Sequence, residues 1–180
     1  MKYQIVYADP PWRQTKGGLR SVRPYQERQL DYPVMSMEDI RTLYVKLSSH
    51  FSYNHTLFLW AIDKYLHESE KLFTDLGYRL HARIIWDKGN GVAPAFTVRY
   101  SHEYLLWLYK PTLMPVAQGM RGKYTTVIRE PSTTHSRKPD AAYRMIEGLY
   151  PEHTKIELFA RHTRLGWDCW GNEVVGSVEI

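Results

Sequence analysis

The chain has 180 residues, of which 43% are hydrophobic and 24% charged, a balance typical of a soluble globular protein. A chain of this length can bury a core without disulfides or a structural metal, so we expect one domain over residues 1–180. The single cysteine, Cys169, excludes an internal disulfide and a cysteine-based zinc site. The net charge of +5 favours a polyanionic partner but does not distinguish DNA from RNA.

Targeting signals are absent from the pattern. No apolar run reaches the ~18 residues of a membrane span, and a strand is predicted almost from Met1, which leaves no room for a signal peptide. We therefore expect a soluble, cytoplasmic protein with no membrane partner and no bound metal.

The first predicted strand contains Ile5, Val6 and Tyr7, which are the β-branched and aromatic residues that strands favour. Pro10 and Pro11 follow closely, and because proline has no N–H donor they cannot continue a central ladder. The chain must leave the sheet at Asp9.

The segment Asp9-Pro10-Pro11-Trp12 suits methyl transfer to an aromatic amine. The exocyclic nitrogen of adenine is a poor nucleophile, and acceptors that hold its N–H bonds would assist it. Asp9 offers a carboxylate, Pro10 a rigidly directed carbonyl, and Trp12 a surface on which an extruded base can stack. In the alternative interpretation, the two prolines make an ordinary turn and Trp12 is a core residue.

Strand-like and helix-like segments alternate along the rest of the chain, which predicts a three-layer α/β domain with a mostly parallel sheet. Helices are expected after Ser36, with a capping box to Asp39, after Asp63 as a cap and ending at Gly77, and with Pro139 in the first turn. Further strands are expected at residues 56–62, 79–86, 103–109, 125–128, 155–159 and 167–170, with loops 87–102 and 110–124 between them.

Basic residues gather in two segments that are predicted to be loops. The first contains Arg13, Lys16, Arg20, Arg23 and Arg28, and the second contains Arg121, Lys123, Arg129, Arg137 and Lys138. Loops 13–35 and 110–138 are therefore the expected clamps on a nucleic acid, with their arginines on phosphates.

The strand at residues 155–159 is followed by Ala160 and Arg161, and later by Gly171-Asn172-Glu173. In open α/β sheets, ligands bind beyond the carboxyl ends of strands, where small residues allow close approach and acidic or amide side chains hold ribose hydroxyls. The pattern suits a nucleoside cofactor, although Ala160 stands where glycine would be expected. A purely structural strand is the alternative.

The order of six motifs resembles the adenine-N6 methyltransferase family that includes the catalytic subunit of the eukaryotic mRNA methyltransferase. These motifs are Asp9–Trp12, Tyr32–Ser36, Leu57–Trp60, Ile84–Lys88, Ser136–Asp140 and Ile156–Arg161, and they span nearly the whole chain. The resemblance implies a Rossmann-like, S-adenosylmethionine-dependent methyltransferase of permuted motif order.

Site roles also follow from the resemblance. The implied catalytic residues are Asp9, Pro10, Pro11 and Trp12. Residues implied to hold S-adenosylmethionine are Asp9, Lys138, Glu157, Phe159, Arg161, His162, Thr163, Asn172 and Glu173. Those implied to contact the target base are Trp12, Tyr32, Lys88, Glu103 and Lys138.

Departures from the family pattern weaken some of these roles. The family commonly has Gly-Arg-Pro-His-Asn where this chain has Ala160-Arg161-His162-Thr163, and Glu173 replaces a more usual glutamine. Lys88 has an alternative interpretation as a solvated loop residue, and Glu103 as a member of a structural ion pair.

The sequence favours direct methyl transfer to adenine N6, with DNA preferred over RNA because the compact chain shows no appended RNA-binding element. A non-catalytic partner subunit is one rival, although such chains tend to lose the acid that Asp9 supplies here. A nucleic-acid-binding module that only stacks bases is the other. The sequence leaves open a monomer, a homodimer or a complex with a second subunit.

Overall fold

The computed structural model describes residues 2–12, 34–92, 97–133 and 137–176. The predictions for loop residues 13–33, which include Tyr32, and for Ser136 lie outside these ranges.

One sheet with the strand order β5-β3-β4-β2-β1-β6-β7 forms the centre of the described structure. Its strands are β1 (Tyr3–Ala8), β2 (Phe51–Ala61), β3 (Arg79–Asp87), β4 (His102–Lys110), β5 (Val127–Arg129), β6 (Lys155–Leu158) and β7 (Asp168–Trp170). β4 runs antiparallel to β2 and β3, and the other pairs are parallel. The amino end of β4 therefore lies at the same edge as the carboxyl ends of its neighbours.

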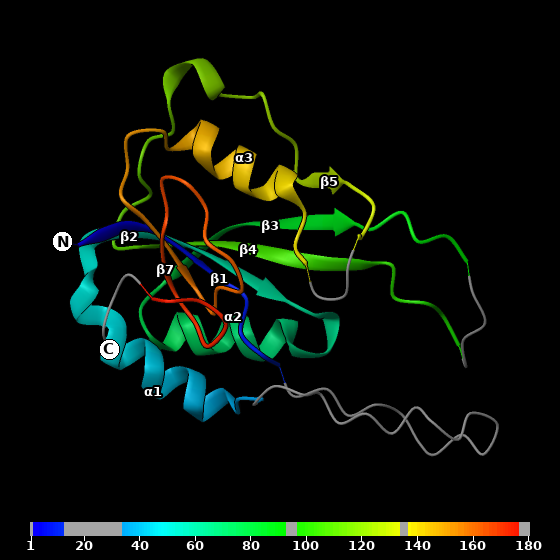
Figure 1. Cartoon of the computed structure of the whole chain (residues 1–180), viewed down its shortest axis with the longest axis horizontal. Helices are drawn as coiled ribbons and strands as arrows, with labels where there is room; N and C mark the ends of the chain where they lie inside the picture. The colour runs from blue at the N-terminus through cyan, green and yellow to red at the C-terminus, as the bar shows by residue number, and fades with distance from the viewer. Residues whose placement is uncertain (1, 13–33, 93–96, 134–136, 177–180) are drawn as a thin grey trace.

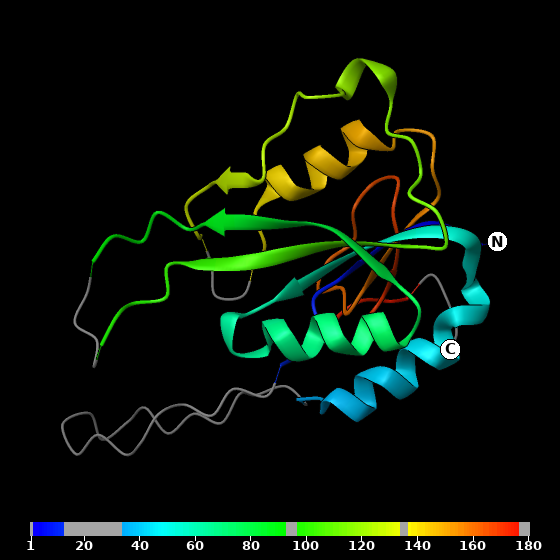
Figure 2. The ribbon, with the colours of Figure 1, turned by 180° about the vertical axis from the view of Figure 1, so that it is seen from behind.

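Helices cover both faces of the sheet. Figure 1 shows α1 (Met37–Leu47) and α2 (Leu66–Asp75) on one side and α3 (Asp140–Leu149) on the other, and the reverse view in Figure 2 agrees. Three short 3₁₀ turns complete the described elements: Ser48–His50, Asp63–Tyr65 and Gln118–Met120. The predicted three-layer α/β, Rossmann-like fold with a mostly parallel sheet is confirmed.

Alternation along β1 divides the core in two. Val6 and Ala8 face the apolar cluster under α1 and α2, whereas Ile5 and Tyr7 face the cluster under α3. Because successive strand residues point to opposite faces, Asp9 continues the row that faces α3. The period of the strand thus decides on which side the carboxylate lies.

Several predicted helix signals are confirmed. Ser36 and Asp39 form the capping box of α1, and Gly77 adopts a φ of +86° just after α2, in the region that glycine tolerates best. The buried face of α3 consists of Ala142, Tyr143, Met145, Ile146 and Leu149.

Some boundaries were wrong. Asp63 opens a 3₁₀ turn and does not cap α2, which begins at Leu66 without a side-chain cap because that turn intervenes. β2 begins at Phe51, which is buried, and β5 begins at Val127. Pro139 is the N-cap of α3 and not part of its first turn, since its ψ of 138° is extended.

Glu157 is an acid in the core. Its neighbours Ile156 and Leu158 face α1 and α2, so Glu157 faces α3, where its Oε1 accepts a hydrogen bond of 2.8 Å from the Tyr143 hydroxyl. Only 6% of the residue is exposed. Burial raises the pKa of Glu157, and the hydrogen bond from Tyr143 opposes this effect only in part, so the net pKa is about 7.

We predict that Glu157→Gln flattens the pH dependence of stability. The folded pKa exceeds the ordinary value of 4.5, so the folded state holds this proton more tightly, and stability is lost as pH rises through about 7. The variant should gain roughly 1–3 kcal/mol over the wild type at about pH 8 and little at about pH 5. Urea unfolding across this range measures the difference.

The matched control is Glu152→Gln, which neutralises an exposed acid in the turn before β6. It should leave the pH dependence as in the wild type. Equal stability changes in the two variants at both pH values would contradict the assignment of the titration to Glu157.

Candidate active site

Four charged residues from distant parts of the chain meet at the carboxyl edge of the sheet. Asp9 follows β1, Lys88 follows β3, Glu103 lies at the amino end of β4, and Lys138 precedes α3. All four were predicted site residues, and the structure brings them together as one ionic cluster, named here the edge cluster.

Lys138 is the centre of the edge cluster. Its Nζ lies 3.0 Å from Asp9 Oδ1 and 2.7 Å from Glu103 Oε2. The second oxygen of Glu103 accepts a 2.5 Å bond from Lys88 Nζ. The side chain of Lys138 is only 10% exposed, so both carboxylates contact an ammonium that has lost most of its water.

Burial and charge pairing compete within the cluster. Burial disfavours the ionised form of Asp9 and raises its pKa, while the charge of Lys138 acts in the opposite direction. Burial alone would lower the pKa of Lys138, but the carboxylates of Asp9 and Glu103 outweigh it, and the net pKa is raised. For Glu103, burial is outweighed by Lys138 and Lys88, and the net pKa is lowered. Lys138 therefore stays charged.

A buried aromatic group lies beneath the cluster, and the sequence analysis gave it no role. Lys138 Nζ lies 5.3 Å from the centroid of the Trp60 ring, a cation–π distance. The Trp60 indole N–H donates to the Tyr7 hydroxyl over 2.6 Å. Trp60 was predicted only as part of a buried strand. The face of the sheet on which it lies follows from period-2 alternation along β2, the same kind of signal that places Asp9 on the α3 side.

Glu130 holds the backbone that carries Lys138. Its two carboxylate oxygens accept bonds from the amides of Asp140, at 2.8 Å, and Ala141, at 3.0 Å, in the first turn of α3. Pro139 at the N-cap makes no side-chain cap bond, so an acid from beyond β5 supplies the acceptor. Glu130 was not among the predicted site residues. A helix that starts at a proline without a capping side chain is the sequence feature that indicates a cap from elsewhere in the chain.

Trp12 lies in the core on the other face of the sheet. The residue is 5% exposed, its ring stacks on Tyr65 with centroids 5.4 Å apart, and its indole N–H donates to the carbonyl of Trp60 over 3.1 Å. It belongs to the apolar cluster under α1 and α2, whereas Asp9 faces α3. This geometry favours the alternative that Trp12 is a core residue, and its stacking on a target base stays a prediction.

The two prolines also serve a turn. The Pro10 carbonyl accepts a 2.8 Å bond from the Trp12 amide, and the Pro11 carbonyl accepts a 3.0 Å bond from the Met35 amide. Each carbonyl has a second lone pair, so the Pro10 oxygen keeps acceptor capacity for a ligand. Turn chemistry and a role in binding are therefore compatible here.

Most residues predicted to hold a cofactor lie beyond β6 and β7. Arg161 Nε lies 3.5 Å from Glu173 Oε1, and the charge of Arg161 lowers the pKa of Asp9, which places it within electrostatic reach of the edge cluster. His162, Thr163 and Asn172 are exposed beside this pair.

Phe159, also predicted to hold the cofactor, has a φ of +63° and packs against Trp170. Glu157 differs from the rest because it lies in the core.

Gly171 keeps the two strand ends close together. A Cβ at this position would come within 2.3 Å of the Ala160 carbonyl oxygen and 2.6 Å of its nitrogen. Ala160 in turn donates its amide to the Trp170 carbonyl over 3.0 Å. The small residues Ala160 and Gly171 thus let the backbones pack directly against each other where β6 and β7 end.

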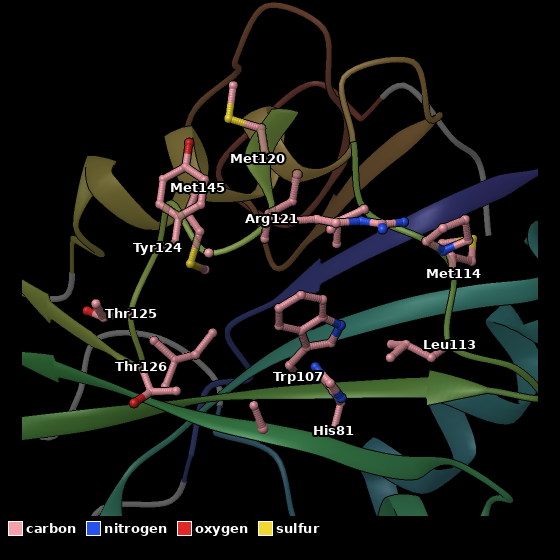
Figure 3. A pocket seen from close by; sticks show the side chains of 16 residues that line it. His81, Trp107, Leu113, Met114, Met120, Arg121, Tyr124, Thr125, Thr126 and Met145 are labelled. Atoms are coloured by element: carbon pink, nitrogen blue, oxygen red, sulfur yellow. The ribbon is translucent and has the colours of Figure 1, made fainter. Parts of the chain in front are cut away.

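A cavity of about 420 Å³ lies elsewhere, between α3, the segment at residues 113–126 and the face of β3 and β4. Figure 3 shows His81, Trp107 and Arg121 among its lining side chains. None of the edge-cluster residues lines it. It is separate from the charged site.

The described ranges lack a metal-binding cluster and a membrane-spanning helix. Residues 2–12, 34–92, 97–133 and 137–176 contain no group of three or more His, Cys, Asp or Glu side chains suited to a metal ion. Within the same ranges, no helix has the length and apolar character needed to cross a membrane.

Comparison with known proteins identifies the family. The MT-A70 family matches residues 3–173. The chain is 28% identical to the Type II methyltransferase M.MunI of a Mycoplasma species, over 96% of the chain and 78% of that protein. It is 29% identical to a putative N(6)-adenosine-methyltransferase MT-A70-like protein of Medicago truncatula, over 97% of the chain and 27% of that protein.

The human N(6)-adenosine-methyltransferase catalytic subunit METTL3 is 28% identical over 97% of the chain. The chain spans only 29% of that protein's length, so it corresponds to a part of METTL3 but to most of M.MunI. The predicted resemblance is confirmed: the chain is a methyltransferase that belongs to the MT-A70 family, whose curated relatives include N(6)-adenosine-methyltransferases.

Proposed function

We propose that this protein transfers a methyl group from S-adenosylmethionine to the exocyclic N6 of adenine, with DNA as its nucleic acid. The observation that carries the proposal is the edge cluster. In it, Asp9 faces α3 beyond the carboxyl end of β1 and is paired with a buried, charged Lys138. Its similarity to the Type II methyltransferase M.MunI, of which the chain covers 78%, supports DNA as the substrate.

The residues at the edge fit S-adenosylmethionine by their chemistry. Lys138 offers an ammonium to the carboxylate of the methionine part, and Glu173 and Arg161 offer an acid and a cation to the ribose. The close packing of Gly171 on Ala160 holds Arg161 and Asn172 near each other at the ends of β6 and β7, where ligands bind in open α/β sheets. When bound, the sulfonium would supply an activated methyl group with a good leaving group.

Asp9 is the residue that would receive the adenine amine. Lys138 Nζ contacts Asp9 Oδ1, and we propose that the other carboxylate oxygen accepts an N–H of the target. Lys138 and Arg161 lower the pKa of Asp9 against the effect of burial and so favour the ionised acceptor. Because the Asp9 side chain is only 21% exposed, few water molecules compete for the same oxygen.

Recognition of the phosphate backbone would fall to basic residues near this edge. Arg129 ends β5, and the exposed Arg137 precedes Lys138. The expected loop 110–138 is instead interrupted by a 3₁₀ turn and β5, and its first half runs beside the carboxyl end of α3, where the Ala117 amide bonds the Leu149 carbonyl. Arg121 and Arg129 thus lie in separate regions.

RNA is the alternative substrate, and METTL3 is named an N(6)-adenosine-methyltransferase. The direct test incubates the protein with labelled S-adenosylmethionine and duplex DNA, single-stranded DNA or RNA, followed by mass spectrometry of the nucleosides. We expect 6-methyladenine in DNA. Label found only in RNA would show that RNA, and not DNA, is the substrate. Cofactor binding without a methylated base would indicate a non-catalytic partner.

We predict that Asp9→Asn lowers turnover by about 100-fold or more, because the amide loses the charge that strengthens its bond to the amine. Glu103 still pairs with Lys138 in this variant, so the fold should persist, as circular dichroism and thermal unfolding will show. Asp75→Asn, which alters an exposed acid paired with Lys71, serves as the control and should keep full turnover. Near-normal turnover by the Asp9 variant would show that Asp9 has no role in the reaction.

We also predict that Arg129→Gln and Arg137→Gln each make the salt dependence of duplex binding shallower. One lost phosphate contact should change the slope of log K against log salt by about 0.9. Arg121→Gln is the matched control because it removes an equal charge near the other end of α3. Fluorescence anisotropy over a salt series measures the slopes. A larger change in slope for Arg121→Gln than for the other two variants would place the nucleic-acid interface near Arg121 instead.

A further inference from the structure

The connection between β6 and β7, residues 159–167, is unusual for parallel strands. A parallel crossover ordinarily takes a dozen or more residues and usually contains a helix, but this one is short and has none. Backbone hydrogen bonds hold it near its two ends, from the Ala160 amide to the Trp170 carbonyl and from the Trp167 amide to the Arg164 carbonyl. Side-chain contacts hold it against α3.

Arg164 attaches the crossover to α3. Its Nε and Nη2 donate to the two carboxylate oxygens of Glu147, at 2.6 and 3.0 Å, and its Nη1 donates to Asp140 over 2.6 Å. The guanidinium also lies 4.6 Å from the centroid of the Tyr143 ring. Trp167 adds a 2.8 Å bond from its indole N–H to Glu147.

These contacts are stronger than an ordinary surface ion pair. The side chain of Arg164 is 27% exposed, and its fork binds Glu147 in the bidentate geometry that fixes direction as well as distance. Hydrogen bonds from Arg164 lower the pKa of Glu147 and of Asp140, so both acids are ionised at neutral pH. The crossover is held on a rigid helix.

The two ends of this attachment lie beside the proposed ligand residues. Asp140 is two residues beyond Lys138, and Arg164 is three residues beyond Arg161. One guanidinium thus connects the segment that carries Lys138 with the segment that carries Arg161. We propose that Arg164 is a positioning residue that sets Arg161 at a fixed distance from Lys138 for binding of the nucleoside cofactor. This inference rests on the proposed function.

The test is cofactor affinity by titration calorimetry with S-adenosylmethionine, on the full chain. Arg164→Gln should weaken binding about 5- to 30-fold, while turnover at saturating cofactor changes less than about 3-fold, because the chemistry at Asp9 is untouched. Glu147→Gln should weaken binding in the same way but less, since Arg164 keeps Asp140. The double variant should be no weaker than Arg164→Gln alone.

Arg83→Gln is the matched control. Arg83 makes the same bidentate contact with Glu70, at 2.5 and 2.7 Å, between β3 and α2, far from the crossover. Its loss should leave cofactor affinity unchanged. Arg164→Lys keeps the charge but not the fork and should restore affinity only in part.

Three results would overturn the inference. The first is cofactor affinity of Arg164→Gln within about twofold of the wild type, and the second is an equal loss in Arg83→Gln. The third, which applies if Arg164→Gln does not fold, is a folded Glu147→Gln with unchanged affinity. A wild-type protein that binds no S-adenosylmethionine would overturn the proposed function itself, which distinguishes the two failures.

Discussion

The site depends on one buried ammonium. Lys138 lies between Asp9 and Glu103 with only 10% of its side chain exposed, and removing an ammonium from water costs several kcal/mol unless opposite charges replace the water. Two carboxylates do so here, and Lys88 balances the second of them. The edge cluster then contains two acids and two bases, so it is neutral as a whole while Asp9 stays an acceptor. Loss of Lys138 would leave two carboxylates to repel each other.

The sheet and α3 bring the residues of this pairing together. The antiparallel β4 brings Glu103 to the edge where the parallel strands end, and alternation along β1 turns Asp9 to the α3 side. Glu130 caps α3 from beyond β5 and so fixes Lys138, and Arg164 attaches the β6–β7 crossover to the same helix. Asp9, Lys138 and the β6–β7 crossover are therefore all positioned relative to α3. The packing of this one helix thus determines the geometry of the whole site.

Local signals were readable from the sequence, and contacts between distant segments were not. The capping box at Ser36 and the exit of the chain at Asp9 follow from neighbouring residues, and motif order brought Lys88, Glu103 and Lys138 into the prediction. The burial of Trp12 could not be read, because a stacking indole and a core indole look alike in a strand-turn pattern. The cap from Glu130 and the Trp60–Tyr7 bond join residues that only the tertiary fold brings together.

Lys138 keeps the partly buried Asp9 ionisable as an acceptor. The most direct measurement is an NMR titration of the Asp9 carboxyl carbon in the wild type and in Lys138→Met. In the wild type, burial should place the pKa of Asp9 above its ordinary value of 3.8. In the variant, the pKa should rise further, because the ammonium that opposes burial is gone. The same pKa of Asp9 in both proteins would show that Lys138 does not control its ionisation.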